Sequence, residues 1–174
     1  MHIHLTALAA LATLTSALPT LTSRQSAAVL TPTTYNAISI SGGQAGNAAA
    51  EALAVFSALD LNNPASISQS DITFLDRVNK AANLAETQAF NPAIAAASGA
   101  AADALAAGKT KNKVLKLTAT KIQLEAKMAQ GEDVAAKLAE ELKKLDTNVK
   151  ADVKNKGKPS TKLPFDAAVD GGAK

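Results

Sequence analysis

The chain has no cysteine and no tryptophan, and its two histidines, His2 and His4, lie at the extreme N-terminus. Without cysteine, disulfides are excluded, so helix packing must supply the stability that small secreted proteins usually gain from them. Without histidine in the rest of the chain, the commonest general base and metal ligand are missing. We therefore predict no catalytic residue, no cofactor-binding residue and no metal ligand, and we expect that the protein is not an enzyme.

Aromatic residues are also scarce, with four Phe and one Tyr in 174 residues, whereas alanine dominates. Apolar burial stabilises by roughly 25 cal/mol per Å², and alanine has little area to bury, so we expect one core of modest stability. The sequence pI is about 9.1, but lysines alternate with acidic residues and no arginine–aromatic platform is present. Nucleic acid is therefore not an expected partner.

Residues 1–17 predict a secretory signal peptide, with an apolar run from Leu5 to Leu14 followed by small residues that end at Ala17. Cleavage is expected between Ala17 and Leu18, and a second cleavage near Arg24 stays open. No stretch reaches the roughly 18 to 20 apolar residues that cross a bilayer, so no transmembrane span is expected. The predicted location is extracellular, with association to the cell wall as an alternative.

The remaining sequence predicts an all-α fold, a single small bundle of about five helices over residues 42–154. Residues 18–41 are rich in Ser, Thr and Pro, which is typical of a disordered leader. Residues 155–174 turn to Lys, Gly and Pro and are expected to form a solvated tail, in which Leu163 to Phe165 docks back onto the bundle. The five helices are expected near residues 42–59, 68–90, 92–107, 109–130 and 132–154.

Local signals set several of these boundaries. The segment from Ser68 to Asp71 resembles a capping box, and Pro92 suits the first turn of a new helix. Gly108 is interpreted as a cap between the third and fourth helices, with one continuous bent helix as the alternative. Helix one is expected to bury Ala49, Leu53 and Phe56 on one face. The last helix carries an apolar stripe typical of a bundle seam or a coiled coil, formed by Val134, Leu138, Leu142, Leu145, Val149 and Val153.

Three groups of residues are candidates for chemistry. Residues 42–46, Gly-Gly-Gln-Ala-Gly, open a predicted helix and could bind an anion, but they lack the spacing and the lysine of phosphate-binding loops. A flexible, closely packed helix entry is the favoured interpretation. The carboxylate pairs, Asp71 with Asp76 and Glu140 with Glu141, do not lie in register on an apolar helix face, so capping and solvated roles are favoured.

Charge is distributed unevenly along the chain. Residues 18–108 contain three basic and six acidic side chains, whereas residues 109–174 contain fifteen basic and nine acidic ones. Acidic helices could pack against basic ones, or the C-terminal half could attract anionic polymers or membranes. Solvated helix faces are the commoner meaning of such lysines.

Three segments carry a resemblance to known proteins: Ile38 to Asn47, Phe90 to Ser98 and Lys111 to Thr118, behind the Ser-Ala-Leu-Pro of residues 16–19. They resemble a family of cysteine-free, alanine-rich fungal small secreted proteins of unassigned function, which implies fungal secretion and no mechanism. The composition is also similar to the hydrophobic surface-binding protein A family, from which no residue role is carried over.

The expected function is that of a secreted, non-enzymatic interaction protein, either a fungal effector or a cell-surface-associated protein, whose partner is an unknown extracellular protein or surface. The alternative is a secreted helical protein that binds a hydrophobic surface or lipid with its apolar stripes. A hydrolase working through carboxylates ranks third.

Overall fold

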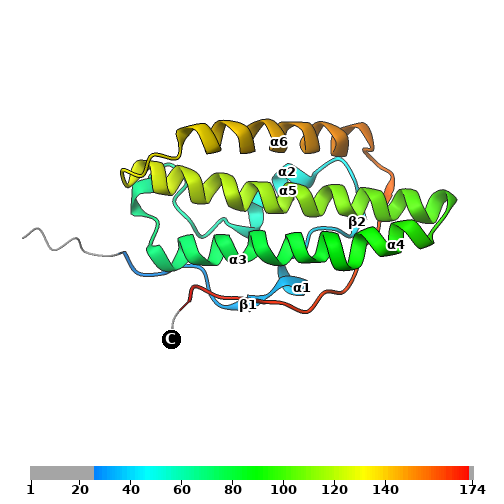
Figure 1. The fold of residues 1–174 in the computed structure, drawn as a ribbon, viewed down its shortest axis with the longest axis horizontal. Coiled ribbons are helices and arrows are strands. Elements are labelled where there is room, and N and C mark those ends of the chain that lie inside the picture. The colour runs from blue at the N-terminus through cyan, green and yellow to red at the C-terminus, as the bar shows by residue number, and fades with distance from the viewer. Residues whose placement is uncertain (1–25, 173–174) are drawn as a thin grey trace, which may run out of the picture.

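The structure, a computed structural model, describes residues 26–172, so the predicted signal peptide lies outside the described residues. Three long helices lie side by side, α3 (Gln69–Ala85), α5 (Gly99–Ala129) and α6 (Ala135–Lys154), with α5 between the other two (Figure 1). The shorter α2 (Ala48–Val55) packs against both α5 and α6. This arrangement confirms a mostly α-helical bundle.

The helix predicted near residues 68–90 does not end before Asn91, because the chain stays helical beyond that residue. Helix α3 continues into a widened π-helical turn, η2 (Glu86–Phe90), and then directly into α4 (Asn91–Ala96). Pro92 stands in the first turn of α4, where its missing N–H is tolerated. The chain turns at Ala97 and Ser98, and α5 then runs for 31 residues.

The predicted break at Gly108 is therefore wrong, and the continuous alternative is correct, because α5 passes through Gly108 without interruption. The glycine has a packing role there. A Cβ atom on Gly108 would lie 2.0 Å from the carbonyl oxygen of Thr161 and 3.1 Å from the ring of Phe90. Only a glycine lets the C-terminal segment cross α5 this closely.

Two short antiparallel strand pairs correct the all-α prediction. In the first pair, β1 (Thr33–Thr34) lies against β4 (Ala168–Val169), and in the second, β2 (Gly43–Gln44) lies against β3 (Pro159–Ser160). Each pair joins the N-terminal segment to the C-terminal one. The remaining elements are a helical turn, α1 (Tyr35–Ile38), and a 3₁₀ turn, η1 (Pro64–Ser66).

The predictions of a disordered leader and a solvated tail are wrong for residues 26–41 and 155–172. Both segments reach the α3 side of the bundle, the C-terminal one after crossing α5, and contribute fully buried core residues, among them Tyr35 and Val169 (Figure 1). The backbone N–H groups of Val29 and Leu30 donate to the carboxylate of Asp71 at 2.8 to 3.2 Å. Polar composition did not indicate order here, because the stabilising partners are distant in sequence.

Docking of Leu163 to Phe165 is confirmed. The ring of Phe165 meets that of Tyr35 edge-on, with centroids 6.1 Å apart, and its backbone N–H donates to Asn36 Oδ1 at 2.9 Å. Such an aromatic pair stabilises by about 0.5–1.5 kcal/mol beyond its buried area.

The buried helix faces differ in part from the predicted ones. Helix α2 buries Ala48 and Ala52, followed by Phe56, whereas the predicted Leu53 is 45% exposed. In α6, Leu138 is 7% exposed but Leu142 is 38% exposed, so the predicted stripe is buried only in part. The cause is that α6 packs on α5 and α2 from one side alone. Within residues 26–172, no helix is both long and apolar enough to span a membrane.

Candidate binding groove

A groove of about 420 Å³ lies where the end of α3, the η2 turn, α5 and α6 meet. We call it the polar groove, because Leu117 is the single apolar side chain in its lining. Its lining combines amide, hydroxyl, ammonium and carboxylate groups, from Asn79, Asn83, Glu86, Thr87, Lys113, Lys116, Glu141, Lys144 and Asn148.

Glu86 is the centre of charge on one wall of the polar groove. Its carboxylate oxygens lie 3.0 Å from the ammonium nitrogen of Lys116, 3.3 Å from that of Lys113 and 3.8 Å from that of Lys109. Burial by itself raises the pKa of Glu86, but the hydrogen bond and charge of Lys116, together with Lys113, outweigh it and hold the pKa below its usual range. Glu86 is therefore ionised at neutral pH.

The opposite wall belongs to α6. Lys144 Nζ lies 2.7 Å from a carboxylate oxygen of Glu140 and 2.9 Å from one of Glu141. The hydrogen bond to Lys144 lowers the pKa of Glu140, and the same bond, with that to Glu141, raises the pKa of Lys144. These side chains are more exposed than Glu86, so their pairing contributes little to the free energy of folding.

No aromatic ring lines the polar groove. Of the five aromatic side chains in the sequence, four are buried in the core and Phe165 packs on Tyr35. Neutral sugars bind proteins largely by stacking on exposed rings, which this groove does not offer. Its chemistry is that of hydrogen bonds and charge.

The glycine-rich segment 42–46 does not form an anion site in the structure. The carbonyl oxygens of Gly42 and Gln44 accept from Lys111 Nζ, and the first N–H of α2, that of Ala48, donates to the Asp152 carboxylate at 2.9 Å. A carboxylate of the protein thus occupies the place of an anion. Gly46 has a φ of +109°, and a Cβ on it would lie 2.8 Å from the Cα of Lys156, so the close-packing interpretation is confirmed.

The carboxylate candidates have structural roles. Asp71 is 1% exposed; its backbone N–H donates to Ser68 Oγ at 3.1 Å, which confirms the predicted cap, and its carboxylate accepts from the Ser68 hydroxyl. Asp76 is on the surface and pairs with Lys80. Glu140 and Glu141 both pair with Lys144. Among residues 26–172, no three acidic or other metal-ligating side chains are grouped closely enough to hold a metal ion.

The sequence interpretation missed a set of buried polar contacts. Lys111, 1% exposed, forms a salt bridge with Glu51 at 2.8 Å. Its neighbour Asn112 accepts a short hydrogen bond from the Tyr35 hydroxyl and donates to the carbonyl oxygen of Ala82 at 2.9 Å. Lys111 stands three and four residues before the apolar pair Val114 and Leu115, and Asn112 stands three before Leu115, a spacing that could have placed them on the buried face. They hold the fold together and leave the polar groove as the candidate site.

Taken together, the fold and the groove define a small helical bundle that is closed by paired terminal segments and carries a charged groove on its long helices. The chain belongs to the DUF8454 family, described as a domain of unknown function, whose profile matches residues 30–164. No curated protein and no solved structure matches the chain. The matched range includes β1, β2 and β3 and ends before β4, so the pairing of β2 with β3 lies within the family domain.

Proposed function

We propose that this protein is a secreted, non-enzymatic interaction protein that binds an extracellular partner through the polar groove. The observation that supports this most is the cluster of Lys109, Lys113 and Lys116 around Glu86. A carboxyl group with a lowered pKa is a poor proton donor and a weak base near neutral pH, so Glu86 suits recognition better than general acid–base catalysis. The extracellular location in this proposal rests on residues 1–17.

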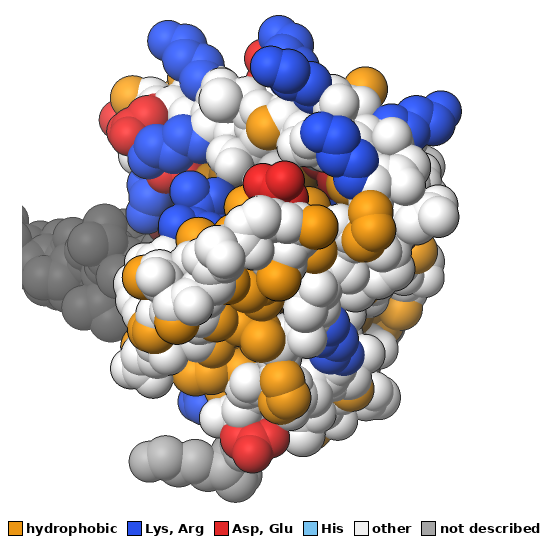
Figure 2. Space-filling model, turned by 90° about the vertical axis from the view of Figure 1, so that its right-hand side faces the viewer, with side chains coloured by type: hydrophobic (Ala, Val, Ile, Leu, Met, Phe, Trp, Pro, Cys, Tyr) orange, Lys and Arg blue, Asp and Glu red, His pale blue; other side chains and the backbone are white. Residues whose placement is uncertain are grey.

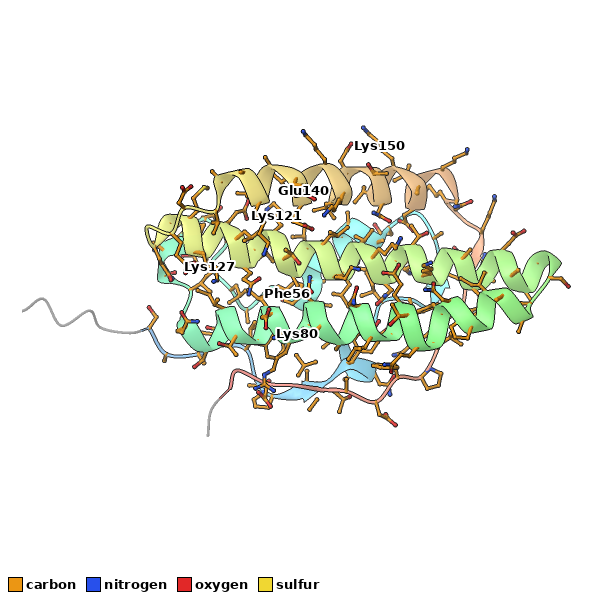
Figure 3. The ribbon with its side chains drawn as sticks, in the orientation of Figure 1. Phe56, Lys80, Lys121, Lys127, Glu140 and Lys150 are labelled. Atoms are coloured by element: carbon orange, nitrogen blue, oxygen red, sulfur yellow. The ribbon has the colours of Figure 1, made fainter. Side chains whose placement is uncertain are left out.

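Site-directed photo-crosslinking tests the proposal. A photo-reactive amino acid at Thr87, an exposed residue that lines the groove, should yield discrete adducts on the cells that secrete the protein or on their substrate. The matched control is the same amino acid at Lys150, which points outward from α6 (Figure 3). Adducts of equal abundance from both positions would contradict a role for the groove. If the wild type turned over a substrate and the Glu86→Gln variant did not, the function of the groove would be catalysis and not binding alone.

Binding to a lipid or hydrophobic surface is a second candidate function, supported by the end of the bundle where α4 turns into α5. Ala95, Ala96, Ala100 and Ala101 are exposed there, and Figure 2 shows hydrophobic side chains gathered on this end, with lysines along one border. Co-sedimentation with vesicles tests it. Ala101→Asp should weaken sedimentation, whereas Ala139→Asp, at an exposed alanine of α6, should not.

A further inference from the structure

We infer that the ligand of the polar groove is an extended, acidic segment of a partner protein, an inference that rests on the proposed function and names its partner. The first reason is the balance of charge on the α5 wall. Three ammonium groups share the single carboxylate of Glu86: those of Lys113 and Lys116 in the groove lining, and that of Lys109 one helical turn beyond it. The side chains of Lys109 and Lys113 remain 27% and 34% exposed. They can therefore bind a further carboxylate without breaking the closest contact, that of Lys116.

The second reason is the spacing of these lysines. An α-helix rises about 1.5 Å per residue, so Lys109 and Lys113 are separated by about 6 Å along α5, and Lys116 stands about 4.5 Å further on. In an extended peptide, alternate side chains project on the same side roughly 6.6 Å apart. Glutamate or aspartate at every second position would thus match the spacing of Lys109 and Lys113, the two lysines with the longer contacts to Glu86, whereas Lys116 keeps its contact with that carboxylate.

The third reason is the amide lining. Asn79, Asn83 and Asn148 line the groove from α3 and α6. Asn79 Nδ2 donates to Thr120, Asn83 Oδ1 accepts from Lys116 and Asn148 Nδ2 donates to the Lys144 carbonyl, which leaves the amide oxygens of Asn79 and Asn148 and the amide nitrogen of Asn83 for a ligand. An extended backbone presents unpaired N–H and C=O groups that need such partners. The groove therefore offers ammonium groups for the side chains and amides for the backbone.

The same lining disfavours other occupants. A lipid chain would need an apolar wall, and Leu117 alone is apolar here. A continuous polyanion such as a nucleic acid would place charge against Glu86 and Glu141, one on each wall. In a peptide with spaced carboxylates, the neutral residues between them can face Glu86 and Glu141, which reduces that repulsion.

Fluorescence anisotropy with two labelled peptides tests the inference: one of alternating glutamate and serine, the other with glutamine in place of glutamate. The protein should bind the glutamate peptide, more weakly as salt rises, and should not bind the glutamine peptide. The double variant Lys109→Gln, Lys113→Gln should bind about five- to thirtyfold more weakly, since two exposed ion pairs of about 0.5 to 1 kcal/mol each are lost. This variant keeps the contact between Lys116 and Glu86, and circular dichroism checks its folding.

Lys80→Gln is the matched control, because Lys80 is exposed on α3 outside the groove and pairs with Asp76 (Figure 3). It should bind like the wild type. Equal binding of the two peptides, or unchanged binding by the double variant, would overturn the acidic ligand. If adducts from Thr87 nevertheless persist, the proposed function stands and the ligand is of another kind. If the glutamate peptide binds as expected but Thr87 yields no adduct, an acidic ligand is supported, whereas the proposal that the groove binds an extracellular partner is contradicted.

Discussion

Replacing Gly108 with alanine should destabilise the protein, although the same change in an ordinary helix interior stabilises it. Alanine is favoured over glycine by about 1 kcal/mol within a helix. At this position, however, the added Cβ would lie 2.0 Å from the Thr161 carbonyl oxygen, which is part of the backbone and cannot rotate away. The C-terminal segment must shift, and the hydrogen bond from Thr161 N–H to the Ala104 carbonyl, 2.9 Å long, is strained or lost.

The relative sizes of these effects decide whether Gly108→Ala stabilises or destabilises the protein. Overpacking costs about 1–3 kcal/mol and loss of the hydrogen bond about 1 kcal/mol, which together exceed the helix-propensity gain. We expect Gly108→Ala to lower the free energy of unfolding by about 1–3 kcal/mol. Urea denaturation followed by helical circular dichroism measures it, with Ala139→Gly on exposed α6 calibrating the propensity effect at about 1 kcal/mol. A Gly108→Ala protein more stable than the wild type would show that the C-terminal segment does not cross α5 as described.

Three further changes have definite expected outcomes. Lys111→Met removes the ammonium group that binds Glu51 and two carbonyl oxygens, and should cost about 2–4 kcal/mol in urea denaturation; a loss below about 1 kcal/mol would show that this cluster is not buried. Leu138→Asp should cost several kcal/mol and Leu142→Asp about 1 kcal/mol or less, since only the first side chain is buried; the reverse order would contradict the packing of α6. Because its pKa is lowered in the folded state, ionised Glu86 stabilises the fold above its ordinary pKa of 4.5, and this stabilisation is lost as the pH falls through the lowered value. The stability difference between wild type and Glu86→Gln should therefore be largest near neutral pH and shrink in acid; a difference that grows on acidification would contradict the ion pairs.

Features with local causes were predictable from the sequence. The Ser68 cap is formed by residues three positions apart, and the apolar spacing of α3 repeats within one helix. The boundary near Gly108 was not predictable, because glycine both caps helices and permits close crossings. Only the position of Thr161, 53 residues further along, selects the second role.

The candidate groove likewise has features that the sequence indicates and features that it does not. The helical spacing of Lys109, Lys113 and Lys116 can be read from the sequence and places all three on one side of α5, where the structure has them around Glu86. Glu86 is 30 residues away from Lys116 on a π-helical turn, and no periodicity in the sequence indicated that turn. The uneven charge along the chain was the one sequence signal of this contact; it left open that acidic segments of the first half pack against lysines of the second, although solvated lysines were the favoured interpretation.

Long-range polar contacts hold distant segments of the chain together in this alanine-rich bundle, which has no disulfides. Asp152 binds the N–H of Ala48 across 104 residues of sequence, and Asn112 binds Tyr35 across 77. Each of these groups is buried, so breaking either contact leaves an unsatisfied polar group in the core, a cost of about 1–3 kcal/mol. Alanines make up nine of the 25 buried hydrophobic residues in the described part of the chain, and each buries little apolar area, so these polar contacts add stability that the alanines do not supply. They also fix which segments meet, which small, interchangeable alanines cannot do by shape alone.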